Sequence, residues 1–283
     1  MRQAGRLVVS HKVISTIVPV GAASLGWADY ETKDLTLHKL RLELPNWPHQ
    51  LNGYKIVQLS DLHLETLHIK LKAITELANS QKPDLLVITG DIATARSDLN
   101  HVTQALAPLQ AKDARIAVMG NNDYAHFSHT QFDEYLRHIA SLGIRVLINE
   151  AVKVTSGTHA YWVVGVDDPA TAHDNVPLAF AQVPNDGLPR LVLAHSTDCI
   201  DGLYNRKVDL FLTGHTHGGQ IVLPLIGAPI RNTLLAEEGI YAGYHVINGI
   251  RVYINVGIGT SGIPLRIGVK PEIAVFELYQ KTV

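Results

Sequence analysis

Gly214-His215-Thr216-His217-Gly218-Gly219-Gln220 follows an apolar run, residues 208–212, that predicts a buried strand. Two imidazoles two residues apart in a glycine-bounded loop cannot share one face of a helix, and they are poorly placed for packing. They are well placed to reach two neighbouring metal ions. The alternative is a polar turn with two solvated histidines, and the other loops of the chain decide between the two.

The composition predicts a globular protein with a large core. The chain has 283 residues, of which 46% are hydrophobic, and this length allows one or two domains. The net charge of −2 provides no overall basic field, so we expect no nucleic-acid partner. Cys199 is the single cysteine, which excludes a disulfide framework and a thiolate zinc site and suits a reducing compartment. The 15 histidines and 26 acidic residues supply nitrogen and oxygen ligands instead.

The N-terminal segment, residues 1–30, is expected to form a unit of its own. An uncharged run over 13–28 follows three basic residues, Arg2, Arg6 and Lys12. The run is short for a transmembrane helix, which needs about 20 apolar residues, but it suits a signal or an anchor. A helix on the body of the protein or on a membrane surface explains the run equally well. The sequence predicts a cytoplasmic protein, with membrane anchoring, peripheral membrane contact and export as open alternatives.

Strands and helices alternate through the first half of the chain, and the second half is rich in strands. The first half predicts strands over 35–44, 54–59, 84–89 and 115–119, and helices over 69–78, 99–109 and 132–142. The second half predicts strands over 151–155, 160–166, 191–194, 210–213, 244–247, 251–255 and 273–278. This order predicts two packed β-sheets with outer helices, an α/β architecture in a single domain that spans residues 31–283.

Five loops with metal-competent side chains each follow a predicted buried strand. In α/β sheets ligands bind at the carboxyl ends of strands, so these loops can converge. The loops are Asp61-Leu62-His63, Gly90-Asp91, Gly120-Asn121-Asn122-Asp123, His195 and His215-Thr216-His217. Two carboxylates, an amide oxygen and four imidazoles suit Mn²⁺, Fe or Zn²⁺ better than Ca²⁺.

Each of these loops also has an ordinary structural explanation. An aspartate at the end of a strand, such as Asp61 or Asp91, is often a helix N-cap. Gly120-Asn121 could be a plain turn, and His195 could be a core histidine with satisfied hydrogen bonds. The five loops together, in this order and all at strand ends, favour a metal site.

The same motif blocks give the chain a family resemblance. The sequence resembles the calcineurin-like metallophosphoesterase superfamily, whose motif blocks are DxH, GD, GNHD, a lone histidine and GHxH in this order, from about Tyr54 to its end. The stretches 58–63, 214–220 and 257–266 resemble the bacterial YaeI/YkuE-like branch of that superfamily. The resemblance implies a four-layer αββα fold, with two mixed β-sheets flanked by helices.

The resemblance also implies a cofactor of two divalent metal ions, with manganese expected and iron or zinc as alternatives. It assigns seven ligands by motif position: Asp61, His63 and His217 to the first ion, Asn121, His195 and His215 to the second, and Asp91 as the bridge. The implied function is hydrolysis of a phosphodiester or pyrophosphate bond by attack of metal-bound hydroxide. The alternative is a non-catalytic scaffold on the same fold. A scaffold predicts missing ligands, however, and all seven positions are filled.

The chain departs from the family motif at Asn122, where GNHD has a histidine that is often drawn as the general acid. An amide can donate a hydrogen bond but cannot transfer a proton, and general acid catalysis is typically worth about 10²–10⁴-fold. His126 or His129 in the following loop could supply the proton, or the leaving group needs little acid, as in a phosphoanhydride or an aryl phosphate. The candidate catalytic residues are therefore Asn122, Asp123, which follows it, and His126.

Two further features bear on the substrate. Residues 221–230 are almost wholly apolar and either line an acyl groove or form a buried β connection. Arg266 either binds a substrate phosphate through its guanidinium or forms an ion pair, for example with Glu272. Some members of the branch are similar to a UDP-2,3-diacylglucosamine pyrophosphatase of lipid A synthesis, so a lipid-linked nucleotide is one substrate candidate.

Overall fold

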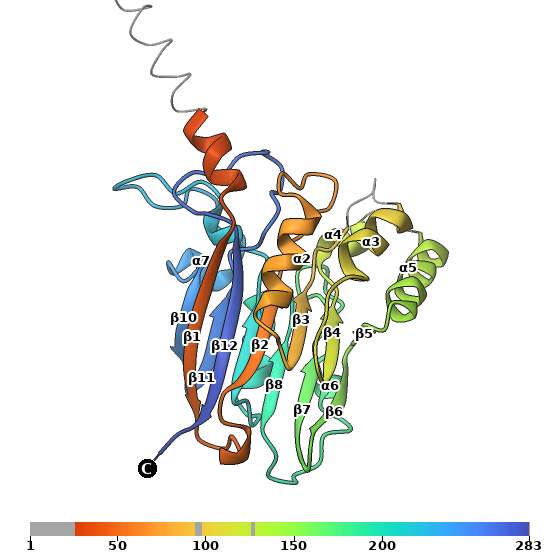
Figure 1. Cartoon of the computed structure of the whole chain (residues 1–283). Helices are drawn as coiled ribbons and strands as arrows, with labels where there is room; N and C mark the ends of the chain where they lie inside the picture. Colours follow the sequence, from red (N-terminus) through yellow and green to blue (C-terminus); the bar gives the residue numbers. More distant parts are fainter. Residues whose placement is uncertain (1–25, 94–97, 126–127, 283) are drawn as a thin grey trace, which may run out of the picture.

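A computed structural model describes residues 26–93, 98–125 and 128–282 of the chain. Within these residues two six-stranded β-sheets lie face to face, and helices cover the outer face of each sheet (Figure 1). The prediction of a four-layer α/β fold with two mixed sheets is confirmed.

The first sheet joins the C-terminal strand to the strands of the first half of the chain. Its order is β1-β12-β2-β3-β4-β5. The strands are β1 (Thr36–Leu44), β12 (Glu272–Gln280), β2 (Tyr54–Leu59), β3 (Leu85–Thr89), β4 (Ala114–Val118) and β5 (Arg145–Val146). From β2 to β5 each strand is parallel to the next, whereas β12 runs antiparallel to β2. The parallel part brings the carboxyl ends of β2, β3 and β4 to one edge.

The second sheet contains the strands of the second half, in the order β10-β11-β9-β8-β7-β6. The strands are β10 (Gly243–Ile247), β11 (Ile250–Ile254), β9 (Leu210–Thr213), β8 (Arg190–Leu193), β7 (His159–Gly165) and β6 (Glu150–Ser156). The four central strands are parallel to their neighbours, and only the edge strands β10 and β6 pair antiparallel.

The central strands are buried on both faces, which explains their continuous apolar sequences. On β3, Leu85 and Val87 pack in the core between the two sheets, while Leu86 and Ile88 pack under the helices of the first sheet. On β8, Leu191 and Leu193 belong to the core between the sheets. Alternate side chains of a strand point to opposite faces, so each apolar run supplies two of the three core layers.

Short helices and helix ends account for the differences from the predicted elements. The helices α2 (Leu71–Ser80), α3 (Leu99–Leu106) and α5 (His129–Ser141) cover the first sheet. The segments α6 (Val176–Ala179), η2 (Thr197–Leu203) and α7 (Leu234–Glu237) cover the second sheet, and η1 (His49–Leu51) precedes β2. Helix α5 begins three residues before the predicted start because Ser128 and Gln131 form a capping box. The sequence did not predict β5 or the five-residue α4 (Asn121–Ala125), because both are too short to show a periodic pattern.

Residues 26–33 are helical and attach to the domain through two buried polar side chains. The carboxylate of Glu31 accepts a hydrogen bond from the backbone N–H of Gly268, and the hydroxyl oxygen of Thr32 accepts one from the backbone N–H of Arg266, both at 2.8 Å. In the described part of the chain no helix is long and apolar enough to cross a membrane. The predicted N-terminal unit lies mostly in residues 1–25, outside the described residues.

Candidate metal centre

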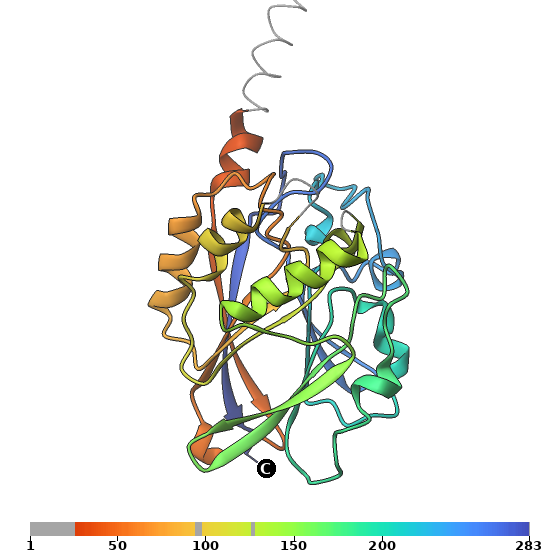
Figure 2. The same cartoon turned by 90° about the vertical axis from the view of Figure 1, so that its right-hand side faces the viewer.

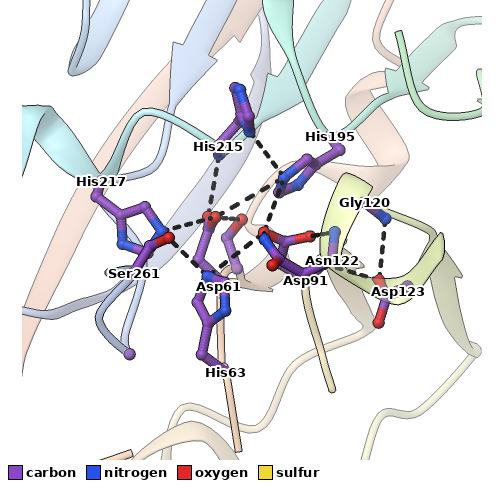
Figure 3. A network of polar contacts seen from close by, with 12 residues as sticks. Asp61, His63, Asp91, Gly120, Asn122, Asp123, His195, His215, His217 and Ser261 are labelled. Atoms are coloured by element: carbon purple, nitrogen blue, oxygen red, sulfur yellow. Dashed lines mark hydrogen bonds and ion pairs between the residues drawn. The ribbon is translucent and has the colours of Figure 1, made fainter. Parts of the chain in front are cut away.

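The five loops that the sequence singles out meet at one edge of the two sheets. Asp61, Asp91 and Asn121 follow β2, β3 and β4, and His195 and His215 follow β8 and β9. Because these strands are parallel within each sheet, their carboxyl ends lie together. Figure 3 shows the carboxylates and imidazoles of this edge pointing toward one another.

A first group of ligands consists of Asp61, His63 and His217. Their ligand atoms all lie within 4.8 Å of one another, and all three residues are buried. Nε2 of His217 is 3.1 Å from Nε2 of His63 and 3.4 Å from Oδ1 of Asp61. Nε2 of His63 also lies 3.4 Å from Oδ2 of Asp91, so the second carboxylate adjoins this group.

A second group shares Asp61 with the first and adds Asp91 and His195. Asp61, Asp91 and His195 again have ligand atoms within 4.8 Å of one another. Nε2 of His195 is 3.3 Å from Oδ2 of Asp91 and 3.1 Å from Nδ1 of His215. The carboxylate of Asp91 is thus within reach of both groups, which is the geometry that a bridging ligand requires.

The donor atoms fit divalent cations. Oδ1 of Asp61 and Oδ1 of Asn121 are buried acceptors without a hydrogen-bond partner in the described residues. A buried polar oxygen without a partner costs free energy, and a cation removes that cost. Carboxylate and amide oxygens with neutral imidazole nitrogens form a ligand set for Mn²⁺, Fe or Zn²⁺.

Backbone strain is concentrated at the candidate ligands. Asp61, His63, Asp91, His215 and His217 all have positive φ, between 44° and 69°. Residues other than glycine rarely adopt this left-handed conformation, and each instance costs about 1–3 kcal/mol. The surrounding hydrogen bonds hold it, since Asp61 N–H donates to the carbonyl of Gly90 and His63 N–H donates to that of Asp91.

Neighbouring polar groups orient the ligands. Ser60 donates its hydroxyl hydrogen to Oδ2 of Asp61 at 2.6 Å, and Thr89 donates to Oγ of Ser60 at 2.8 Å. Nδ1 of His195 lies 2.8 Å from the carbonyl oxygen of Thr89. A carbonyl can only accept, so Nδ1 carries the proton and Nε2 is free to bind a metal.

Gly214 lets the two sheets approach each other closely at the centre. A Cβ at this position would overlap Oγ of Ser60 and Oδ2 of Asp61. The N–H of Gly214 donates to the carbonyl of His195 at 2.8 Å, and the next N–H, of His215, donates to Oδ2 of Asp61 at 3.1 Å. Position 214 therefore requires glycine, because a larger residue would clash with Asp61 of another loop.

The pKa shifts of Asp61, Asp91 and His217 favour the protonation states that bind metals, whereas Asp91 and Asp61 outweigh burial and raise the pKa of His195. Burial alone would raise the pKa of Asp61 and of Asp91, but the neighbouring histidines outweigh burial and hold both below the usual value. Burial, with His63 and Arg266, lowers the pKa of His217 to about 3, so its imidazole is neutral. Neutral imidazole and ionised carboxylate are the ligand forms of these side chains.

The structure gives Asp123 a positioning role. Its side chain is buried and accepts hydrogen bonds from the N–H groups of residues 91, 92, 93 and 120 and from the hydroxyl of Tyr135. It thereby holds the Asp91 loop against the turn that carries Asn121. Burial and the nearby Asp91 raise the pKa of Asp123 to about 7. Asp123 does not line the cavity of the centre, whereas Asn122 does.

Asn122 contacts the shared carboxylate directly. Its Nδ2 donates to Oδ2 of Asp91 at 2.6 Å, and its backbone N–H donates to Oδ1 at 2.8 Å. His126, the predicted substitute for the family histidine, lies outside the described residues.

The structure corrects the prediction for Arg266. The side chain is completely buried and does not line the cavity. Its guanidinium donates through Nε and Nη2 to the carbonyl of Gly259, at 3.1 and 2.6 Å, and Nη2 lies 3.3 Å from Nδ1 of His217. Glu272, the suggested ion-pair partner, instead accepts from the hydroxyl of Tyr253 at 2.8 Å. Arg266 is thus a positioning residue behind His217, and sequence alone could not reveal the Gly259 carbonyl that holds it.

A cavity of about 250 Å³ opens beside the centre. Asp91, Asn121, Asn122, His215 and His217 form its polar wall, and Ile221, Ile230 and Ile263 are the large apolar side chains that line it. The alternative of a buried β connection for residues 221–230 is wrong, because Leu225, Ile226 and Ile230 are exposed. The cavity combines a polar wall at the candidate ligands with apolar side chains.

Comparisons with known proteins agree with this geometry. The family model described as calcineurin-like phosphoesterase matches residues 54–219. The chain belongs to the calcineurin-like phosphoesterase family. Members of this family bind a dinuclear divalent metal centre, and the two ligand groups supply candidate residues for it.

Relatives cover most of the chain. It is 32% identical to YkuE of Bacillus subtilis over 82% of this chain and 81% of that protein. It is 32% identical to the phosphodiesterase YaeI of Escherichia coli over 80% of this chain and 82% of that protein. It is 26% identical to the metallophosphoesterase YkoQ of Bacillus subtilis, over 94% of this chain and 98% of that protein. These matches confirm the family and the branch that the sequence motifs indicate.

Asp91→Asn is expected to reduce the metal content of the protein by at least about half, because an amide offers both ions a single neutral oxygen in place of a carboxylate. Mass spectrometry of metals after Mn²⁺ loading and desalting measures this content. Asp133→Asn, an exposed change on α5, is the matched control and should retain all bound metal. Full retention of two ions in Asp91→Asn would contradict the bridging role.

Proposed function

We propose that this protein hydrolyses a phosphodiester or pyrophosphate bond with two divalent metal ions, of which manganese is the first choice. The observation that carries the proposal is the position of Asp91, which lines an open cavity and whose Oδ2 lies 3.4 Å from Nε2 of His63 and 3.3 Å from Nε2 of His195. The resemblance to YaeI, which is named a phosphodiesterase, supports a phosphodiester substrate. The set of seven ligand residues supports an enzyme rather than a scaffold.

The metals and the protein contribute different parts of the reaction. Two bound divalent ions would polarise the phosphoryl group and acidify a water molecule. The protein orients the shared carboxylate through the two hydrogen bonds that Asn122 donates to it, and it fixes His195 through the carbonyl of Thr89. The side chain of Asn232, which donates to the carbonyl of His215 at 3.0 Å, supports the opposite wall of the cavity.

The proposal also specifies the kind of leaving group that the substrate carries. Among the described residues that line the cavity, the titratable side chains are Asp91, His215 and His217, and all three are candidate metal ligands. No described lining side chain is thus left to act as a separate general acid. This supports a leaving group that departs as a stable anion, as from a phosphoanhydride or an aryl ester.

The cavity supports an amphiphilic substrate, for which a lipid-linked nucleotide such as UDP-2,3-diacylglucosamine is the candidate. Ile221, Ile230 and Ile263 line the cavity together with the polar candidate ligands. A volume of about 250 Å³ accommodates a phosphoester and its nearest substituents. Acyl chains would have to extend past Ile230 and Ile263, which are exposed at the cavity mouth.

Hydrolysis of bis-p-nitrophenyl phosphate in the presence of Mn²⁺ tests the proposed function. We expect metal-dependent turnover that chelation abolishes and that renewed addition of Mn²⁺ restores, because the phosphoryl group is activated by the bound ions. Release of p-nitrophenol is measured by absorbance. Absence of turnover with Mn²⁺, Fe²⁺ and Zn²⁺, in protein shown to contain two ions per chain, would refute the hydrolase proposal.

Asn122→His tests the leaving-group argument. An imidazole at this position can donate a proton, so kcat/KM for a dialkyl phosphodiester should rise by about tenfold or more while that for bis-p-nitrophenyl phosphate changes little. Initial rates on both substrates give this ratio. Asn232→His, which adds an imidazole elsewhere in the same cavity, is the control. Equal changes on both substrates would contradict the argument.

A further inference from the structure

Large apolar side chains are exposed at the end of the molecule that carries the metal centre. We define the apolar rim as Leu223, Leu225, Ile226 and Ile230 on loop 220–232, together with Ile263 on loop 257–268. Leu225 has a relative exposure of 109% and Ile226 one of 69%. Apolar side chains gathered on a surface in this way mark an interaction site.

The backbone holds the tip of loop 220–232 in a defined shape. Leu223 and Gly227 exchange two backbone hydrogen bonds, at 3.0 and 2.8 Å. Between them, Leu225 has a φ of 68°, in the left-handed region that is unfavourable for leucine. In the isolated chain both the left-handed backbone of Leu225 and the exposure of its side chain to water are unfavourable, so the turn indicates a partner that covers it.

Hydrogen bonds join the rim to the helical residues 26–33. Val222 N–H donates to the carbonyl of Ile267 at 2.7 Å, and Ile267 N–H donates to that of Gln220 at 3.0 Å. Loop 257–268 is in turn bound to Glu31 and Thr32 of the helix. Figures 1 and 2 show the helix and both loops at the same end of the molecule.

This helix exposes two aromatic side chains. Trp27 has a relative exposure of 60% and Tyr30 one of 59%, and their ring centroids are 6.3 Å apart. Tryptophan and tyrosine are enriched at the interface between membrane and water, because each ring has an apolar body and a polar group. Exposed aliphatic and aromatic side chains at one end of a protein suit a lipid surface.

The charges of this end favour an anionic partner. None of the 26 acidic residues lies in residues 220–232 or 257–270. These two stretches contain three basic residues, of which Arg231 and Lys270 are exposed and Arg266 is buried. Asp29 on the helix and Asp34 directly after it pair with Lys33 and Lys270 at 2.7 Å, and Glu31 is buried against the backbone of Gly268. A second copy of the chain would bring the same basic stretches together in a symmetric contact, whereas an anionic lipid surface complements them.

We propose that this end of the molecule docks on the surface of an anionic lipid bilayer through the apolar rim, with Leu225 and Ile226 inserted among the head groups. Docking in this orientation places the cavity, which Ile230 and Ile263 line, against the bilayer. The metal centre would then receive phosphoesters from the lipid surface, a consequence that rests on the proposed function. Binding to the bilayer does not depend on that function.

Sedimentation of the full-length chain with vesicles of phosphatidylcholine and phosphatidylglycerol tests the proposal. The unchanged protein should bind, and Leu225→Asp/Ile226→Asp should lower its partition coefficient by at least about tenfold, because two inserted aliphatic side chains become charged. Leu178→Asp/Val246→Asp, on α6 and β10, adds the same charges at exposed apolar positions outside the rim and should bind like the unchanged protein. Thermal unfolding checks that both variants are folded.

Three results would overturn the proposal. One is failure of the unchanged protein to bind vesicles, and another is equal binding by the rim variant and its control. The third is concentration-dependent dimerisation by light scattering that the rim variant alone abolishes, without vesicle binding, since this assigns the rim to a second copy. Turnover of bis-p-nitrophenyl phosphate in solution is a separate measurement, so failure of docking and failure of the proposed hydrolase activity are distinguishable.

Discussion

The structure at this edge depends on burying the carboxylates of Asp61 and Asp91 among four imidazoles. The ion-pair partners that the structure describes for these two carboxylates are all histidines. Such a group of charges and lone pairs is costly in a dry interior unless cations lie between them. The ligand side chains can lie this close together because five of them have positive φ and because Gly214 leaves room for Asp61. Asp123 holds the Asp91 loop against the Asn121 turn through hydrogen bonds to both.

The fold could be predicted because strands buried on both faces have continuous apolar sequences. The run over Leu85–Thr89 is such a case, and the same pattern marks β8 and β9. The sequence did not predict elements whose formation depends on partners distant in the chain. Strand β5 has only two residues and forms because it pairs with the edge of β4. Helix α4 has five residues and is held in place by the hydrogen bonds of Asp123.

The candidate ligands could be proposed from sequence because each follows a recognisable strand and carries a distinctive side chain. Their supporting residues could not be proposed in this way. Ser60 and Thr89 look like ordinary strand-end residues until the structure shows their hydroxyls beside Asp61. Arg266 has the same residue type whether it faces a substrate or lies behind His217, and only the contact with Gly259 distinguishes the two. Loop 220–232 showed its apolar character in the sequence, but its exposure is a property of the fold.

The central claim is that one carboxylate, Asp91, joins two metal positions. Anomalous diffraction from crystals grown with Mn²⁺ tests it most directly, because the ions are located independently of any activity. The account predicts two peaks about 3.5–4 Å apart on either side of the Asp91 carboxylate, one beside His63 and His217 and the other beside His195 and His215. A single peak, or two peaks that do not share Asp91, would contradict it.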